Sequence, residues 1–413
     1  MNLQTVTEKD GSPAQIEPPW LPFSSGGRHV RSVYLHVPFC AVKCNYCAFY
    51  SKEPDRETVE KYVEALCAEI GRAAGCAAPQ TLFFGGGTPS LLSVKQLERV
   101  FKAVHEAGWG HSDEWTVECN PATLNKDKVQ LFVEYGISRV SMGVQSMEPE
   151  LLERLGRIHT ASMVCKTYDL LRAGGISNIN LDLMFAIPGQ TMAMWERTIK
   201  TILALGSEHL SCYEVIYEED TPLYHSLKAG EFEIDEEIAE DMYFMLLDKL
   251  AGADFHQYEV ANFARHMDEG PVRDYPTHAC RHNLNYWRGG SYLGLGPSAN
   301  GFIDGIRYQN VANTQRYVEL ICSQPHAMEW EERLTPIARA GELAAFGFRT
   351  VRGWNHDEFR AVTGFDLQDQ WPREIDRMVA AGWMKNEDGQ SWLTPEGLRF
   401  ADAVAQEFLV LGD

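Results

Sequence analysis

Short apolar runs alternate with amphipathic segments along the first half of the chain. The apolar runs are rich in β-branched and aromatic residues, which is typical of buried strands. The segments between them repeat apolar residues every three or four positions, as one face of a helix does. This alternation predicts a parallel sheet with crossover helices. The predicted strands are residues 32–37, 81–84, 115–118, 139–143, 179–183 and 209–215, and the predicted helices are 54–72, 94–107, 126–134, 162–173 and 192–205.

Six such β/α units predict an α/β fold with an open, partial (β/α)₆ barrel. A doubly wound open sheet fits the same periodicity, so both arrangements stay open at this point. In either one, the loops at the carboxyl ends of the strands form the binding site. We therefore expect the unusual residues after the predicted strands to converge on one face.

The alternation ends after Asn300. Helices are expected at 336–348, 357–363 and 367–381, followed by a hairpin of 383–385 and 391–393 and a last helix from Pro395. Helices followed by a hairpin with an Asp-Gly turn predict a smaller, winged-helix-like α+β domain. Its mixed charges include no basic recognition face, so packing or partner contact is favoured over DNA binding. The predicted domains are a flexible N-terminal arm 1–31, a core 32–225, an extension 226–310 and a C-terminal domain 311–413.

Composition limits the class of protein. The chain of 413 residues is 45% hydrophobic, long enough for one large and one smaller domain. A formal net charge of −21 argues against a nucleic-acid partner, because phosphate binding needs concentrated Lys and Arg. The polar N-terminus does not resemble a signal peptide, and no apolar run is long enough for a membrane span. We expect a cytoplasmic protein.

Three cysteines follow the first predicted strand at C-x₃-C-x₂-C spacing, namely Cys40, Cys44 and Cys47. Three thiolates on one loop can surround a soft metal centre and leave one iron of a cluster open for another ligand. Structural zinc is the alternative, but such sites normally close with a second ligand pair, and no second cysteine pair follows. The other cysteines are scattered singly, as in a reducing compartment. The spacing favours an iron–sulfur cluster over zinc.

Polar and glycine residues follow the next strands. Three consecutive glycines at 85–87 allow a close backbone approach, or simply make a tight turn. Three polar residues stand at strand ends, and each taken by itself is more simply explained as a polar cap; they are Glu118, Gln145 and Asp182. Together with Arg157 they form an array able to bind an amine, a carboxylate and a ribose. These are the parts of S-adenosylmethionine (SAM).

The cysteine motif followed by GGGTPS resembles the radical SAM superfamily. The blocks YLHVPFCAVKCNYCAFY, ECNPATL, RVSMGVQSM, LGRIHTA, NLDLMFAIPGQT and HNLNYWRGGSYLGLGPSA are similar to the oxygen-independent coproporphyrinogen III oxidase-like family, within it to the heme chaperone branch. The resemblance implies a [4Fe–4S] cluster whose electron cleaves SAM to a 5′-deoxyadenosyl radical. It implies these roles: Cys40, Cys44 and Cys47 as cluster ligands; Tyr34 and Tyr46 packed around cluster and cofactor; Gly86, Gly87 and Thr88 at the methionine amino end; Glu118 and Arg157 at its charged groups; Gln145 and Asp182 at the ribose.

Two features favour the chaperone branch over the oxidase. The oxidase carries a fourth cysteine two positions after the third, where this chain has Phe49, and it has a longer N-terminal extension. The resemblance also implies that the HNxxYW motif binds heme, with His282 as candidate axial ligand and His278 and Cys280 as alternatives. The implied partners are heme or a porphyrinogen, an apo-hemoprotein that receives heme, and an electron donor such as a flavodoxin or ferredoxin, with peripheral contact to membrane proteins. Oxidative decarboxylation of coproporphyrinogen III remains the alternative function.

Overall fold

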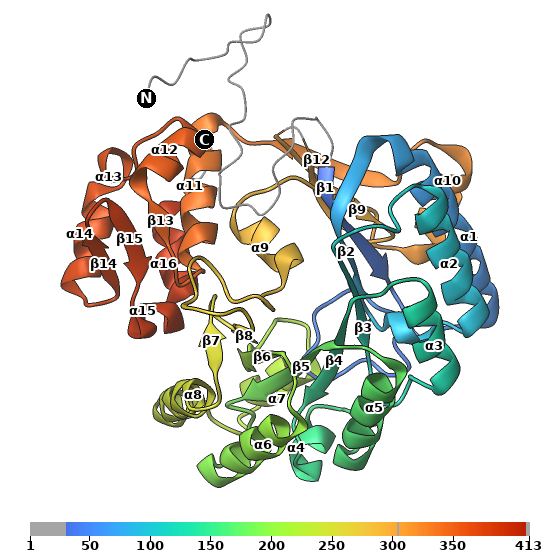
Figure 1. Ribbon diagram of the computed structural model, residues 1–413, viewed down its shortest axis with the longest axis horizontal. Helices are drawn as coiled ribbons and strands as arrows, with labels where there is room; N and C mark the ends of the chain where they lie inside the picture. Colours follow the sequence, from blue (N-terminus) through green and yellow to red (C-terminus); the bar gives the residue numbers. More distant parts are fainter. Residues whose placement is uncertain (1–29, 304, 410–413) are drawn as a thin grey trace, which may run out of the picture. The chain divides into compact units, whose positions relative to one another are not determined.

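The computed structural model describes residues 30–303 and 305–409 (Figure 1). These residues form two compact units. Of the described residues, the larger unit contains 30–286, 290–303 and 305–333, and the smaller contains 287–289 and 334–409. The predicted N-terminal arm lies outside the described residues except for its last two positions, which already belong to the first strand.

Six parallel strands form the centre of the larger unit, and neighbours in the sheet are also neighbours in the sequence. A doubly wound sheet would reverse its strand order at a switch point, so this alternative is excluded. The partial (β/α)₆ barrel is confirmed. The strands are β1 Val30–Val37, β2 Ala77–Gly86, β3 Glu114–Cys119, β4 Arg139–Gln145, β5 Asn178–Phe185 and β6 His209–Glu214.

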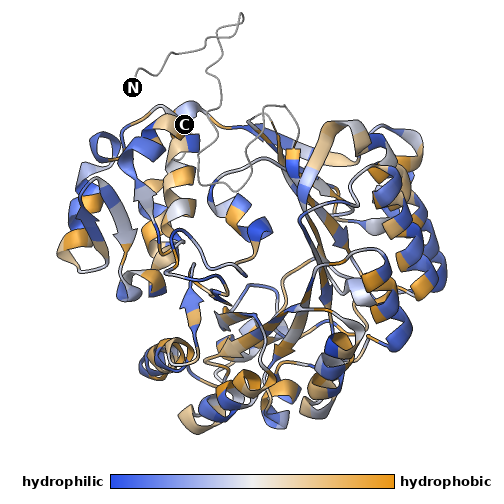
Figure 2. Ribbon diagram, in the orientation of Figure 1, coloured by the Kyte–Doolittle hydropathy of each residue, from blue (hydrophilic) through white to orange (hydrophobic). Residues whose placement is uncertain are grey.

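Helices follow these strands and cover the outer face of the sheet (Figure 1). Five of the six begin with a side-chain cap, and α4 does not; Ser93 and Gln96, for example, form a reciprocal capping box at the start of α2. Their apolar faces join the main core, except that of α4, whose Leu151 belongs to a smaller cluster. Hydrophilic residues lie on their outward side (Figure 2). The helices are α1 Arg56–Ala73, α2 Val94–Glu106, α3 Lys126–Glu134, α4 Pro149–Arg154, α5 Ala161–Gly174 and α6 Met192–Leu205, with one-turn 3₁₀ helices at Ala74–Cys76 and Pro89–Leu91.

The sheet extends beyond the six predicted strands at both edges. On one side β9 pairs in parallel with β1 and is followed by β10, β11 and β12. On the other side β8 runs antiparallel to β6, and β7 runs antiparallel to β8. The boundary that we expected after residue 310 falls inside this unit, because β12 pairs with β11. These elements are α7 Pro222–Lys228, α8 Glu236–Ala251, β7 Phe255–Gln257, β8 Asn262–Arg265, α9 Arg281–Trp287, β9 Tyr292–Leu295, β10 Asn300–Ile303, β11 Ile306–Asn310, α10 Thr314–Ser323 and β12 Met328–Arg333.

The smaller unit combines helices with a three-stranded antiparallel sheet of order β13-β15-β14, as expected for a winged-helix-like α+β fold. The single helix expected at 367–381 is two helices, because Pro372 begins a new one and lacks the N–H needed to continue the first. The elements are α11 Pro336–Phe348, β13 Trp354–Asn355, α12 His356–Thr363, α13 Leu367–Gln370, α14 Pro372–Ala380, β14 Met384–Glu387, β15 Gln390–Leu393, α15 Pro395–Arg399 and α16 Ala401–Phe408. No helix in the described part of the chain is both long and apolar enough to cross a bilayer.

Candidate cofactor site

A cavity of about 480 Å³ opens at the carboxyl ends of the six parallel strands. Its wall is built by the loop after β1, the ends of β2 to β6, and the segment between α4 and α5. All but two of the predicted site residues line it. They are Cys40, Cys44, Tyr46, Cys47, Gly86, Gly87, Thr88, Glu118, Gln145, Arg157 and Asp182.

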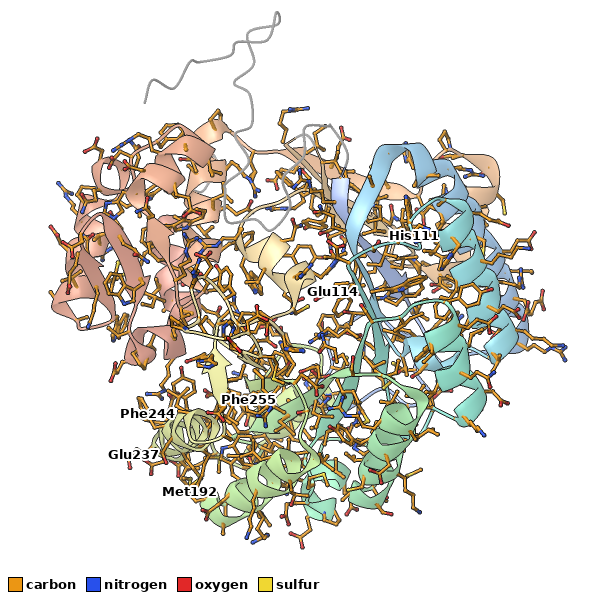
Figure 3. All side chains as sticks on the ribbon, viewed as in Figure 1. His111, Glu114, Met192, Glu237, Phe244 and Phe255 are labelled. Atoms are coloured by element: carbon orange, nitrogen blue, oxygen red, sulfur yellow. The ribbon has the colours of Figure 1, made fainter. Side chains whose placement is uncertain are left out.

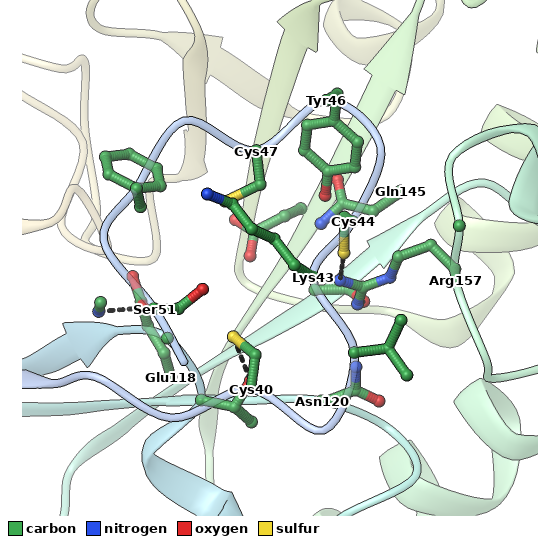
Figure 4. A pocket seen from close by; sticks show the side chains of 18 of the residues that line it. Cys40, Lys43, Cys44, Tyr46, Cys47, Ser51, Glu118, Asn120, Gln145 and Arg157 are labelled. Atoms are coloured by element: carbon green, nitrogen blue, oxygen red, sulfur yellow. Dashed lines mark hydrogen bonds between the residues drawn. The ribbon is translucent and has the colours of Figure 1, made fainter. Parts of the chain in front are cut away.

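The cysteine loop is tied down by its backbone. The N–H of Cys40 donates to the carbonyl of Lys52 at 3.1 Å, and the N–H of Asn45 donates to that of Leu155 at 3.0 Å. Figure 4 shows the three cysteines arranged around the space that the loop encloses. All three are free thiols. These backbone hydrogen bonds hold the loop to the segments around Lys52 and Leu155.

The donor set fits a cluster bound by three cysteines. Three soft thiols approach one space from separate points of the loop, and in a cluster each thiolate binds a different iron. No group of three or more His, Cys, Asp or Glu side chains within residues 30–303 and 305–409 is close enough to hold a single ion. Burial and the neighbouring thiols raise the pKa of Cys47, and a bound cluster would supply the positive charge that deprotonates it.

The glycine turn packs closely against the end of β1. A Cβ at Gly87 would lie 2.6 Å from the carbonyl oxygen of Phe39, and Gly86 has a φ of +110°. The Thr88 N–H donates to the Phe39 carbonyl at 2.8 Å. The Thr88 hydroxyl lies 3.7 Å from the sulfur of Cys40. The turn is thus held next to the first cysteine.

Two carboxyl groups lie on the floor of the cavity. Glu118 accepts a hydrogen bond from the Gly86 N–H at 3.2 Å. Burial, and then the charge of Asp182, raise the pKa of Glu118 to about 8. Asp182 accepts from the Asn180 amide at 2.7 Å and from the Ser141 hydroxyl at 3.2 Å. A cationic amine bound beside these groups would favour their ionised forms.

Arg157 links the cysteine loop to the end of β4. One guanidinium nitrogen donates to the Gly143 carbonyl at 2.6 Å, and the other lies 3.4 Å from the sulfur of Cys44. Gln145 has a φ of 65°, and the register of β4 against β5 shifts between Gly143 and Gln145. Such a bulge redirects the side chain that follows. Arg157 and Gln145 both line the cavity and can therefore contact a ligand on its floor.

Tyr34 and His282 are not among the residues that line the cavity. The Tyr34 hydroxyl lies 3.0 Å from Nδ1 of His36, and its ring stacks on Phe83 at 6.2 Å. His282 is 1% exposed. Its ring also stacks on Phe83, with the two ring centres 5.1 Å apart. Burial, followed by the charge of Arg139, lowers the pKa of His282 to about 3.

Both nitrogens of His282 have hydrogen-bond partners. Nδ1 lies 2.8 Å from the hydroxyl of Thr81, and Nε2 lies 2.7 Å from the hydroxyl of Tyr286. Because Thr81 donates its own proton to Ser32, the His282 Nδ1–H is the donor and Nε2 is the acceptor. In this arrangement both nitrogens are therefore engaged in hydrogen bonds.

The sequence did not predict a set of hydrogen bonds among Lys128, Ser90 and Thr123, here called the latch. The amine of Lys128 in α3 donates to the carbonyls of Ser90 at 2.6 Å and Thr123 at 2.9 Å. The hydroxyls of Ser90 and Thr123 are 2.6 Å apart. These bonds join the glycine turn to the loop after β3. A signal was present, since Lys128 occupies an apolar-face position three residues before Leu131.

Known proteins match the chain over both units. Residues 34–202 match the radical SAM superfamily, which implies a [4Fe–4S] cluster and SAM, and residues 334–400 match the HemN C-terminal domain. The heme chaperone HemW of Bacillus subtilis is 33% identical over 386 residues, covering 92% of this chain and 99% of the relative. HemW of Escherichia coli is 30% identical over 390 residues, covering 92% and 98%.

A solved structure agrees on the fold. Coproporphyrinogen III oxidase (HemN) from Escherichia coli, a radical SAM enzyme, matches with a TM-score of 0.78 at 20% identity, covering 92% of this chain and 91% of that one. The HemW relatives show the family as well as the fold, because their identity to this chain is higher, at 33% and 30%, along nearly their whole length. The chain therefore belongs to the HemW family of radical SAM proteins.

Proposed function

We propose that this protein is a heme chaperone that binds heme and transfers it to apo-hemoproteins. The observation that carries the proposal is the similarity to proteins named heme chaperone HemW, at 29% to 33% identity over 92% of this chain. The loop supports it: the position of the oxidase's fourth cysteine is Phe49, whose side chain is 70% exposed. A cytoplasmic location and an electron donor such as a flavodoxin or ferredoxin belong to the same proposal.

Cys40, Cys44 and Cys47 would hold the cluster, which when reduced supplies the electron that cleaves SAM. The turn at 86–88 and Glu118 would bind the amino end of SAM, since Glu118 is an acceptor directly beside that turn. Arg157 would pair with its carboxylate. Gln145 and Asp182 would orient the ribose from the ends of β4 and β5.

The test is anaerobic reconstitution of the full chain followed by two assays. Iron and sulfide analysis with a visible spectrum should show about four irons per chain in the wild type, and none of the cluster absorbance in a Cys40→Ser/Cys44→Ser/Cys47→Ser variant. Stoichiometric zinc without iron would overturn this step. Titration with hemin should give a stable Soret band, and the loaded protein should pass heme to apo-myoglobin. A wild-type protein that takes up no hemin would refute the chaperone function.

The second candidate is oxygen-independent coproporphyrinogen III oxidase, and the fold match to HemN is the observation that favours it. Incubation of the reconstituted protein with coproporphyrinogen III, SAM and a reductant separates the two. We expect no protoporphyrinogen IX. Its formation, dependent on SAM and abolished by the triple cysteine variant, would establish the oxidase instead.

A further inference from the structure

We infer that heme binds at the outer rim of the cofactor cavity, against a ring of exposed apolar side chains, and that His282 has a structural role and is not its iron ligand. The inference rests on the proposed function and locates its cargo. The ring comprises five side chains that all border the cavity, here called the apolar rim: Val42 (46% exposed), Phe49 (70%), Ile158 (54%), Tyr213 (42%) and Ile216 (61%).

The apolar rim is assembled by the fold from three separate segments. Val42 and Phe49 belong to the cysteine loop, Ile158 to the segment between α4 and α5, and Tyr213 and Ile216 to the end of β6. Single exposed apolar side chains are ordinary on a protein surface, whereas several around one opening indicate a ligand or partner. The rim is distinct from the polar floor, where Glu118, Arg157 and Asp182 would bind a polar cofactor.

The chemistry of the rim suits a flat macrocycle with an anionic edge. Two of its members, Phe49 and Tyr213, are aromatic and can stack on a porphyrin face. Two basic side chains of the described residues line the cavity, Lys43 and Arg157. Arg157 is already assigned to the carboxylate of SAM, so Lys43 is the cation suited to a propionate. Figure 4 shows Lys43 extending from the cysteine loop toward Cys47.

Two acidic residues beside the apolar rim favour one orientation of the bound heme. Glu214 and Glu218 line the cavity on the β6 side. Propionates would be repelled there and attracted toward Lys43 on the cysteine loop. The apolar part of the macrocycle would then cover Ile216 and Tyr213. A recipient protein is a less suitable occupant of a ring that surrounds a cavity mouth, because much of such a protein's surface would face open space.

His282 is committed to a structural task. Its Nε2, the atom that would ligate iron, accepts the Tyr286 hydroxyl proton, and its ring lies flat against Phe83. The carboxylate of Glu114, labelled in Figure 3, accepts the backbone N–H groups of His282 and Arg281 at 3.0 Å each. Cys280 is buried as well, with its sulfur 3.5 Å from Glu114. These contacts fix the start of α9 against β2 and β3.

Hemin titration of the full, reconstituted chain tests the inference. The rim variant Phe49→Ser/Ile216→Ser should bind hemin at least about tenfold more weakly, a difference of about 1.4 kcal/mol. The control Val133→Ser/Ile238→Ser removes two apolar side chains that are 46% and 36% exposed on α3 and α8, away from the cavity, and should bind as the wild type does. His282→Gln should keep the position of the Soret band, because the iron ligand is elsewhere.

Two outcomes would overturn the inference while leaving the chaperone function intact. The rim variant binds hemin as tightly as the wild type, or His282→Gln loses the Soret band while circular dichroism and cluster absorbance stay unchanged. A rim variant that binds hemin normally and loses only transfer to apo-myoglobin would make the rim a surface for the recipient protein. Failure of the wild type to bind hemin at all would refute the proposed function itself, so the two failures are distinguishable.

Discussion

The carboxyl group of Glu118 is the clearest case of a residue whose chemistry depends on its surroundings. Its pKa rises from 4.5 to about 8, first because it is buried and then because Asp182 lies nearby. Between these two values the folded protein keeps a proton that the unfolded chain releases. The free energy of unfolding therefore falls as pH rises from about 4.5 to about 8, and does not fall further above that.

This linkage predicts the behaviour of Glu118→Gln. The introduced glutamine side chain cannot ionise, so the free energy of unfolding of the variant should lack this part of the decline between about pH 4.5 and about pH 8. The wild type should lose stability relative to the variant by on the order of a few kcal/mol over that interval. Urea unfolding of the cofactor-free proteins measures the difference. Parallel curves for the two proteins would contradict the raised pKa.

At the scale of elements, the site depends on loops that helix α3 fastens from behind. The buried amine of Lys128 satisfies two carbonyls that belong to different loops. Burial lowers the pKa of this amine, as expected for a cation held away from water. The latch therefore holds the glycine turn and the loop after β3 in one relative position by side-chain hydrogen bonds.

Loss of the latch is expected to destabilise the protein. Lys128→Met keeps the helix and its apolar contacts but leaves two carbonyls without their donor, at a cost of about 2–4 kcal/mol in the free energy of unfolding. Lys126→Met on the same helix is the matched control, because Lys126 is exposed. Chemical denaturation compares the two. Equal effects would mean that the latch contributes nothing specific.

At the scale of the whole molecule, the smaller unit is not continuous in sequence. Arg288, which comes from the segment just after α9, is 2% exposed and donates to the Gly353 carbonyl at 2.7 Å. Its guanidinium also lies 4.9 Å from the centre of the Trp354 ring. The segment Trp287–Gly289 therefore completes a unit whose remaining described residues begin at Leu334.

Removal of this arginine should loosen the smaller unit selectively. Arg288→Ala loses a hydrogen bond and a cation–π contact, and we expect a loss of about 2–4 kcal/mol, seen as faster hydrogen exchange in α11 to α16. Arg281→Ala, at the other end of α9, is the control. Its side chain is 41% exposed and its ion pair with Asp113, at 3.5 Å, belongs to the weak surface class. Exchange that rises equally in both variants would refute this role.

The local pattern was sufficient for the repeating part of the fold. Six strands and five helices were predicted within a few residues because each carries its own apolar periodicity, and α11 was predicted at both ends. The strands at the edges of the sheet were not predicted. Most are three to five residues long, and their pairing depends on partners far away in the sequence, as with β9 and β1. The break at Pro372 was visible in the sequence and was overlooked.

The sequence by itself determined the cysteine spacing, the order of the β/α units and the residues at the strand ends, because these follow from residue type and local period. Only the tertiary structure decided which side chains meet. It brought Arg157 to Cys44 across 113 positions, gathered the apolar rim from three segments, and buried His282 against Thr81 from 201 positions away. Nothing in the local pattern around His282 encodes that contact, because the environment of a side chain is set by the packing of distant elements.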